Sequence, residues 1–374
     1  MIEADPLALA GALIRCASIT PVDAGAQDVL AVTLKNIGFR VVPLQFGEVR
    51  NLYARIGDSA PHFCFAGHTD VVPPGDGAWG ADPFGAEIRD GRLYGRGACD
   101  MKGAIAAFVA AAAGHLAEGT NNGSISLLVT GDEEGPARDG TARVLEWMAD
   151  HDERPDFCLV GEPTNPARLG EVIKIGRRGS LNATLTVHGR QGHVAYPGRA
   201  DNPVHRLLRA LGALIAAPLD AGSTWFEPSG LQITSVDVGN RTTNVIPTTA
   251  RAALNIRFNN LHRGADLAAW LRAVLGYHAA EAEIDVAISA EPFLTAPGPE
   301  IERLAKAIET TTGIAPRLDT AGGTSDARFI AAYCPVAEFG LVGGSMHQAD
   351  EHVPIADIVA LVGIYRAVLK AFLG

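Results

Sequence analysis

Hydrophobic and polar residues follow two different patterns along the chain. Up to about residue 177, short apolar runs typical of buried strands are separated by helical patterns. The alanine-rich stretch 101–118 predicts a buried helix, and Asp90-Gly91 between two apolar segments predicts a β-hairpin. Strands that alternate with helices indicate a mostly parallel sheet covered on both faces. The predicted strands of this region lie at 62–66, 124–130 and 156–160.

The middle region differs because its strands are not outnumbered by helices. Helices are predicted at 203–216 and 265–275, and strands at 181–188, 231–238, 250–258 and 282–290. We expect a small α+β sandwich at 178–291, inserted into an α/β domain that has a mixed, mostly parallel sheet. That domain would consist of residues 1–177 and 292–374, and it would end on an amphipathic helix after Pro354. Two domains agree with a length of 374 residues, which is more than one hydrophobic core usually serves.

The net charge restricts the possible partners of the protein, and the cysteines indicate its compartment. The formal net charge of −11 repels phosphate backbones and anionic lipid, so we expect neither nucleic acid nor a membrane surface as a partner. The longest apolar run, 104–113, is about half of what a membrane span needs. The chain has five cysteines, an odd number, and no Cys-x-x-Cys motif. This favours reduced thiols in the cytoplasm over a set of disulfides.

Histidines and carboxylates stand beside glycines at the ends of several predicted strands. In an open α/β sheet the carboxyl ends of parallel strands gather at one edge, where ligands bind. Imidazole and carboxylate ligands without cysteine suit zinc or a similar divalent ion in a catalytic site. Each motif alone is more often an ordinary loop, turn or helix cap, and only their joint occurrence is informative. The residues are His68, Asp70, Asp100, Glu133, Glu134, Glu162 and His347.

Three of the polar motifs leave alternatives open. Glu133 and Glu134 are adjacent, so one can bind a metal while the other stays free as a general base, or both can be ligands. Arg257 shares one face of its predicted strand with Asn255 and could bind a carboxylate, or it could be an exposed strand arginine. The turn before Thr324 could hold an anion on backbone N–H groups, or it could be an ordinary helix cap.

In this order, the motifs resemble the dinuclear zinc aminoacylase and carboxypeptidase family over nearly the whole chain. The resemblance implies two Zn²⁺ per chain, with Co²⁺ as a substitute. His68 and Glu162 would hold one ion, Glu134 and His347 the other, and Asp100 would bridge them. Asp70 would orient His68, and Glu133 would be the general base toward water. The resemblance also implies a cis peptide at Asp100-Met101.

The same resemblance assigns roles to the inserted domain. It implies a homodimer formed through that domain, with His193 stabilising the oxyanion in the active site of the other subunit; the alternative is a surface-loop histidine. One departure is Gly343, where many members carry an asparagine four residues before the metal-binding histidine. Substrate contacts implied by the resemblance are Arg177, Ser180, Tyr196, Asn244, Arg257, Gly323 and Thr324.

Two stretches, 174–180 and 322–330, narrow the resemblance to a branch that acts on an N-acyl diamino acid. The implied reaction is hydrolysis of N-succinyl-LL-2,6-diaminopimelate to succinate and LL-2,6-diaminopimelate, in lysine and diaminopimelate biosynthesis. The alternatives are a related deacylase, such as acetylornithine deacetylase, or a zinc carboxypeptidase. A metal-free binding protein on the same fold would be expected to lack a ligand or the base, and this chain has all of them.

Overall fold

The chain divides into two compact units. The computed structural model describes residues 4–119, 121–216 and 218–374. Unit 1 contains the residues up to Ile175 together with Thr295–Asp319 and Ser325–Gly374, and unit 2 contains Gly176–Leu294 together with Thr320–Thr324. Residues 320–324 therefore pack with unit 2, although the sequence pattern groups them with the rest of 292–374.

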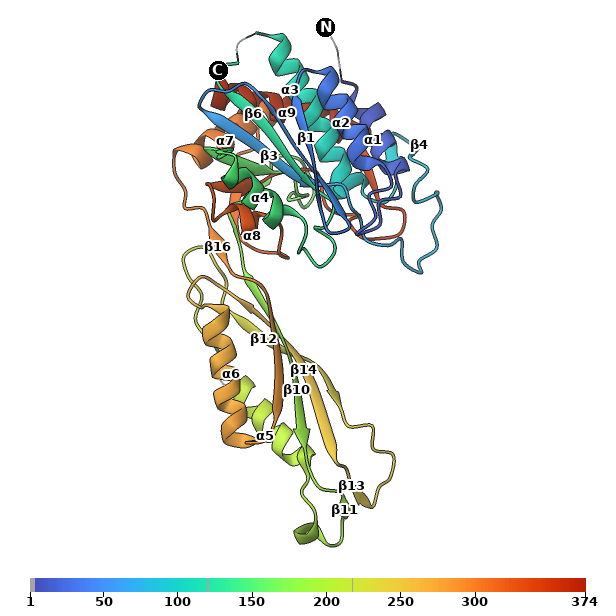
Figure 1. The fold of residues 1–374 in the computed structure, drawn as a ribbon, viewed down its shortest axis with the longest axis vertical. Helices are drawn as coiled ribbons and strands as arrows, with labels where there is room; N and C mark the ends of the chain where they lie inside the picture. The colour runs from blue at the N-terminus through green and yellow to red at the C-terminus, as the bar shows by residue number, and fades with distance from the viewer. Residues whose placement is uncertain (1–3, 120, 217) are drawn as a thin grey trace. The chain divides into compact units, whose positions relative to one another are not determined.

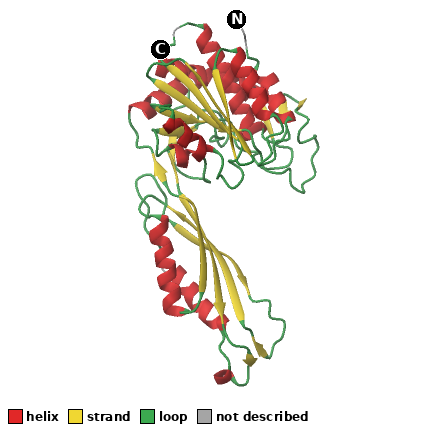
Figure 2. Cartoon of the chain, in the orientation of Figure 1, coloured by secondary structure: helices red, strands yellow, loops and turns green. Residues whose placement is uncertain are grey.

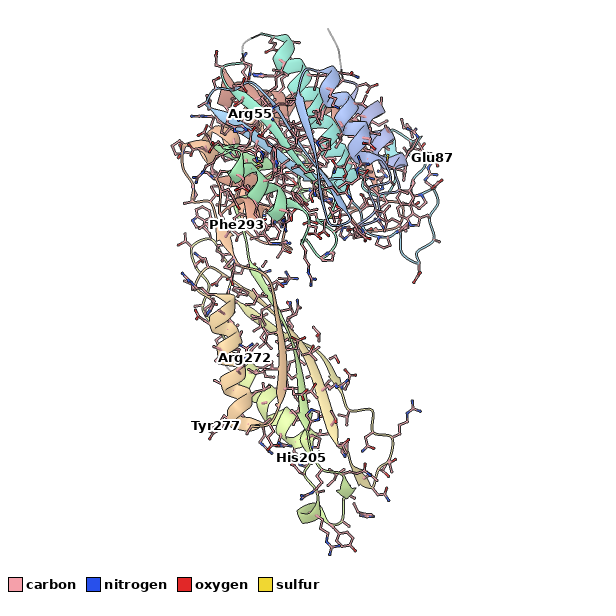
Figure 3. The ribbon with its side chains drawn as sticks, in the orientation of Figure 1. Arg55, Glu87, His205, Arg272, Tyr277 and Phe293 are labelled. Atoms are coloured by element: carbon pink, nitrogen blue, oxygen red, sulfur yellow. The ribbon has the colours of Figure 1, made fainter. Side chains whose placement is uncertain are left out.

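The chain leaves and re-enters unit 1 at neighbouring points. The backbone N–H of Thr295 donates to the carbonyl of Ile175 over 2.7 Å. On the side of unit 2, β9 (Gly176–Arg177) pairs antiparallel with β16 (Phe293–Leu294). Figure 3 labels Phe293 in this short pair. Unit 2 is thus an insertion whose two ends lie side by side.

An eight-stranded mixed sheet forms the centre of unit 1 (Figure 1). Four neighbouring strands, β6, β3, β7 and β18, run parallel, while β1 and β2 are antiparallel at one edge. At the other edge β8 runs antiparallel to β18 and parallel to β17. A mixed, mostly parallel sheet was predicted, and this part of the prediction is confirmed. In spatial order the strands are β1 (Arg40–Phe46), β2 (Val49–Ile56), β6 (Ser124–Thr130), β3 (His62–His68), β7 (Phe157–Val160), β18 (Val336–Glu338), β8 (Val172–Lys174) and β17 (Arg317–Asp319).

Helices cover both faces of this sheet. Phe65 of β3 stacks on Phe108 of α3, with ring centroids 4.2 Å apart, and also contacts Tyr365 of α9. Tyr53 of β2 lies in register with Ala66, on the opposite face, and its ring contacts Trp147 of α4. The helices of unit 1 are α1 (Pro6–Arg15), α2 (Ala26–Asn36), α3 (Gly103–Ala117), α4 (Thr141–Asp150), α7 (Pro299–Thr312), α8 (Ala327–Ile330) and α9 (Ile355–Leu373).

Local sequence signals account for several of these elements. Asp5 caps α1 by accepting the N–H of Leu7 over 2.9 Å, as expected for an aspartate before a proline at the first turn. The hairpin of β4 (Glu87–Arg89) and β5 (Arg92–Tyr94) turns on Asp90 and Gly91, both with positive φ, which is the backbone that the Asp-Gly pair favours. Strand β19 (His352–Pro354) then pairs with β5.

The predicted helix at 101–118 begins later than expected, at Gly103. Before it, Ala98–Lys102 form a π-helical turn in which Asp100 and Met101 depart from helical backbone angles. The peptide Asp100-Met101 is cis, as the resemblance implied. The backbone N–H of Asp100 is bound outside the helix, by the carboxylate of Glu351 at 3.3 Å. Asp100 therefore precedes α3 rather than belonging to it.

Unit 2 contains a four-stranded antiparallel sheet covered on one face by two helices (Figure 2). Along β14 the buried and less buried positions alternate, and the buried side chains of β10 and β14 pack with α5 and α6 in one core. Figure 3 labels Arg272 and Tyr277, two exposed residues of α6. The main elements are β12 (Gly230–Asp237), β14 (Thr249–Phe258), β10 (Gly179–His188), β15 (Glu283–Ala290), α5 (Pro203–Ile215) and α6 (Gly264–His278), with a small pair of β11 (Gly192–His193) and β13 (Val245–Ile246).

Candidate metal centre

Parallel strands bring the predicted ligands of unit 1 to one edge of the sheet. His68 is the last residue of β3, Glu133 and Glu134 follow β6, and Glu162 follows β7. These three strands are adjacent and parallel, so their carboxyl ends lie together. His347 comes from the loop before β19, and Asp100 comes from the π-helical turn before α3.

The carboxylate of Asp100 lies between two imidazoles. Its Oδ1 is 3.2 Å from Nε2 of His68, and its Oδ2 is 3.2 Å from Nε2 of His347. Nε2 of His347 is also 2.9 Å from Oε1 of Glu134, and Nε2 of His68 is 3.7 Å from Oε1 of Glu162. Each imidazole thus has a carboxylate of its own, and both share Asp100.

This donor set fits divalent metal ions. One ligand atom each from His68, Asp100 and Glu134 lies within 4.8 Å of the others. Imidazole nitrogen and carboxylate oxygen are the ligands that zinc takes in catalytic sites. The two halves of the arrangement, each a histidine and a glutamate around one shared aspartate, offer places for two ions.

Asp70 connects His68 to the loop after β6. Nδ1 of His68 is 2.9 Å from the carbonyl oxygen of Asp70 and 3.7 Å from its Oδ1. A proton on Nδ1 leaves Nε2 free to bind a metal. The Asp70 carboxylate accepts the backbone N–H groups of Glu133 at 3.2 Å and Glu134 at 3.0 Å. Asp70 thereby orients His68 through its backbone carbonyl, and it fixes the backbone of the two glutamates through its carboxylate.

The shifted pKa values of these side chains reflect the number of carboxylates packed into the centre. Hydrogen bonds with Asp100 and Glu134 raise the pKa of His347 to about 10. Burial alone would raise the pKa of Asp100, but its hydrogen bonds with His347 and His68 outweigh burial and hold it below the usual range. Burial, followed by the charge of Glu162, raises the pKa of Glu133 well above its usual range. Carboxylates so close together need cations to balance them.

The predicted substrate contacts form two groups in unit 2. One is at the end near β9, where Nη1 of Arg177 donates to the carbonyl of Ala321 at 3.3 Å, so that Arg177 lies against the segment that carries Gly323 and Thr324. Ser180 and Arg257 are direct cross-strand partners in β10 and β14. Burial, together with the charge of Arg178, lowers the pKa of Arg257.

The second group lies at the other end of unit 2, where Figure 1 shows β11 and β13. His193 pairs with Val245 across these strands, and the N–H of Val194 donates to the carbonyl of Asn244 over 3.1 Å. The rings of His193 and Tyr196 are 5.8 Å apart between centroids. His193, Tyr196 and Asn244 are all exposed. Within unit 2, the two groups of predicted substrate contacts therefore lie at opposite ends.

Two buried residues beside the metal centre were not singled out from the sequence. Arg96 and Glu351 form an ion pair 2.7 Å long directly behind Asp100 and His347. A contact between residues so far apart in the chain leaves no local pattern. The sequence offered only two weak signs of this pair: Arg96 lies between two glycines, and Glu351 follows shortly after His347.

Comparison with known proteins places the chain in a class. The model of peptidase family M20/M25/M40 matches residues 64–371, and the chain belongs to this family. A relative from Gluconacetobacter diazotrophicus, named succinyl-diaminopimelate desuccinylase, is 64% identical over 98% of this chain and 97% of its own length.

Solved structures share the fold. An M20 family metallo-carboxypeptidase from Sulfolobus solfataricus has a TM-score of 0.81 at 17% identity, covering 98% of this chain and 99% of that one. A protein from Bacillus subtilis, described as a dinuclear metal binding peptidase from the M20 family, has a TM-score of 0.72 at 15% identity, covering 98% and 96%. Among the residues that the structure describes, no helix is long and apolar enough to cross a membrane.

Proposed function

We propose that this chain hydrolyses the amide bond of N-succinyl-LL-2,6-diaminopimelate to succinate and LL-2,6-diaminopimelate, in lysine and diaminopimelate biosynthesis. The observation that carries the proposal is the 64% identity, over nearly the full length, to a relative named succinyl-diaminopimelate desuccinylase. The arrangement of histidines and carboxylates in unit 1 supports it, because hydrolysis of an amide by water needs an activated water and a polarised carbonyl.

Two ions, which we take to be Zn²⁺ with Co²⁺ as a substitute, would be held by the chain's own ligands. His68 and Glu162 would hold one ion and Glu134 and His347 the other, and Asp100, whose two oxygens each lie 3.2 Å from one imidazole, would serve both. Such a pair, when bound, lowers the pKa of water and polarises a carbonyl.

Glu133 is the general base in this proposal. Its backbone is fixed by Asp70 at 3.2 Å, and its neighbour Glu134 contacts His347 at 2.9 Å. Glu133 is therefore left to accept a proton from the attacking water and to deliver it to the leaving amine.

The substrate has three carboxylates, and a protein with a net charge of −11 must bind them with local groups. Arg177 and the segment with Gly323 and Thr324 are in contact, at 3.3 Å between Nη1 and the carbonyl of Ala321. Arg257 and Ser180 lie beside each other across two strands. These residues form an anion-binding group with guanidinium, hydroxyl and backbone N–H donors.

The length of one strand supports a homodimer formed through unit 2. Arg177 precedes β10 and His193 follows it, and the ten residues of β10 span about 30 Å. One small substrate cannot contact both ends of this strand in one chain. We therefore assign His193, Asn244 and Tyr196 to the active site of the partner, where the His193 imidazole stabilises the oxyanion.

The surface and the cysteines support a cytoplasmic enzyme that needs neither nucleic acid nor a membrane as a partner. All five cysteines are free thiols, and four of them are buried. Reduced cysteines are typical of the cytoplasm. The net charge of −11 disfavours binding to phosphate backbones or anionic lipid.

The test is hydrolysis of a panel of N-acyl amino acids by protein supplied with Zn²⁺. We expect kcat/KM for the succinyl substrate to exceed that for N-acetylornithine by at least tenfold to a hundredfold, because a site group left without its partner costs about 1–3 kcal/mol. Arg257→Ala should reduce this preference. Removal of metal by a chelator should abolish turnover, and Zn²⁺ should restore it.

Three outcomes would contradict the proposal in different ways. Equal rates on both substrates would remove the succinyl preference but leave the metal-dependent hydrolase. Faster cleavage of dipeptides would indicate a carboxypeptidase. Full activity after complete removal of metal would exclude the proposed use of His68, Asp100 and Glu134.

A further inference from the structure

The buried pair of Arg96 and Glu351 connects the segments that carry two of the proposed metal ligands. We propose that these two residues are positioning residues for the metal centre: Glu351 fixes Asp100, and Arg96 fixes His347. The proposal rests on the metal-dependent function above, and it concerns residues that neither touch the substrate nor bind an ion themselves.

Glu351 holds the backbone at Asp100. Its Oε2 accepts a hydrogen bond from Nη1 of Arg96 at 2.7 Å. Its Oε1 accepts the backbone N–H groups of Cys99 at 3.1 Å and of Asp100 at 3.3 Å. The side chains of Arg96 and Glu351 are 2% and 0% exposed. Since Asp100 contacts both imidazoles, a shift of its backbone would move the carboxylate that would serve both ions.

Arg96 holds the backbone at His347. Its Nη2 donates to the carbonyl of His347 at 3.4 Å, and its Nη1 donates to that of Gln348 at 3.2 Å. Nη2 also donates to the carbonyls of Pro73 and Pro74, at 3.4 and 3.2 Å, in the loop that follows His68 and Asp70. One guanidinium therefore links the loop after β3, the histidine loop before β19 and, through Glu351, the turn before α3.

The backbone at His347 needs such support. His347 has a φ of 62°, in the left-handed region that a residue with a side chain rarely adopts. A conformation of this kind persists only where the surroundings hold it in place. Arg96 binds the carbonyl of this residue, and the side chain then reaches Glu134 at 2.9 Å and Asp100 at 3.2 Å.

Stability alone is a poor explanation for this pair. The cost of removing two charges from water offsets much of their attraction, so a buried ion pair is weak evidence of stabilisation. A guanidinium adds a planar set of N–H donors with fixed directions, which a lysine lacks. The four carbonyls that Arg96 binds use those directions, which is what positioning requires.

The two partners should have different effects on the two ions. Arg96→Lys keeps the charge beside Glu351 but loses the planar fork, so the ion at Glu134 and His347 should bind about 10–100-fold more weakly. The other ion should lose less affinity, because Arg96 binds the carbonyl of His347 itself but binds only Pro73 and Pro74 in the loop after His68. Glu351→Gln alters the group that holds Asp100, which both ions share, so both should bind more weakly.

The experiment is titration of metal-free protein with Co²⁺, one equivalent at a time, followed by visible absorption and chelator competition. The Tm of each metal-free variant separates general destabilisation from loss of affinity. Arg55→Lys is a matched control, because Arg55 pairs with the buried Glu153 at 2.5 Å in the same unit. In register, Arg55 lies beside Ser126, toward the start of β6, away from the strand end at Thr130; Figure 3 labels it.

Unequal loss of the two ions in Arg96→Lys, with normal binding in Arg55→Lys, is the expected result. Wild-type affinity for both ions in Arg96→Lys would overturn the positioning role while leaving the metal centre. A similar loss in Arg55→Lys would reduce the effect to general stability and would also overturn the role. Fewer than two ions in the wild-type protein would overturn the proposed centre and this role together. Should Arg96→Lys not fold, Glu351→Gln decides, and unchanged binding of both ions there would refute the proposal.

Discussion

A mixture of two inactive variants should regain activity if each active site is built from two chains. We consider Glu133→Ala, which removes the proposed base, and His193→Ala, which removes the proposed oxyanion group. Under the arrangement proposed above, the Glu133 and His193 that serve one site come from different chains. In a mixed dimer, one site therefore carries both substitutions and the other carries neither.

The structure sets the size of the effect. With β10 spanning about 30 Å between the Arg177 end and the His193 end, action within one chain would require one small substrate to reach both. Equal amounts of the two variants, exchanged at random between dimers, give mixed dimers as about half of the population, each with one intact site of two. The mixture should thus recover about one quarter of wild-type activity, although each parent alone is reduced by about 10²-fold or more.

The assay is the initial rate of substrate hydrolysis after unfolding and refolding the mixture, with differently tagged chains to confirm that mixed dimers have formed. A mixture of Glu133→Ala with His347→Ala is the control, because both residues belong to unit 1 and every site of that mixed dimer keeps one lesion. Recovery in the control, or none in the test mixture despite mixed dimers, would refute action across the interface.

Two further outcomes are expected. Glu133→Ala should retain both metal ions in elemental analysis while turnover falls about 10²–10⁴-fold; loss of metal would instead make Glu133 a ligand. Burial, aided by the charge of Arg55, lowers the pKa of His62 to about 4 in the folded protein. Between pH about 6.5 and about 4, the His62 imidazole is therefore neutral in the folded protein but takes up a proton in the unfolded chain. Relative to His62→Gln, the wild type should lose about 3 kcal/mol of unfolding free energy as the pH falls from about 6.5 to about 4, measured by urea unfolding; a difference independent of pH would contradict this.

The sequence located the parts of the fold that have a strong local pattern. Apolar runs predicted β6, whose bounds at Ser124–Thr130 match the expectation, and the polar residues that follow β3, β6 and β7 do converge. The edge strands β1 and β2 were not assigned, and strands of three residues such as β8 and β17 are too short to show a period. The direction of each strand depends on contacts with distant segments, which a local window does not contain.

The candidate site was predictable to a similar degree. Motifs identified the histidines and carboxylates in two ways. His68, Glu134 and Glu162 each adjoin a glycine at or shortly after the end of an apolar run, whereas Asp100 and His347 were identified from the order of the motifs along the chain. They did not reveal that Arg177 and His193 lie at opposite ends of unit 2, although the length of the predicted strand between them contained that information. The pair of Arg96 and Glu351 depends on two residues brought together only by folding, so no pattern in the sequence predicted it.

The hydrogen bond between Thr295 and Ile175 has a consequence for how such a chain can be rebuilt. Because the insertion starts and ends at adjacent points, one or two residues could close the gap, and joining ends that already lie together adds little loop entropy. Most of unit 2 could then be removed, or replaced by another domain, without changing the strand order of the eight-stranded sheet in unit 1. Residues 320–324, which pack with unit 2, would need a new partner, and redesign should begin there.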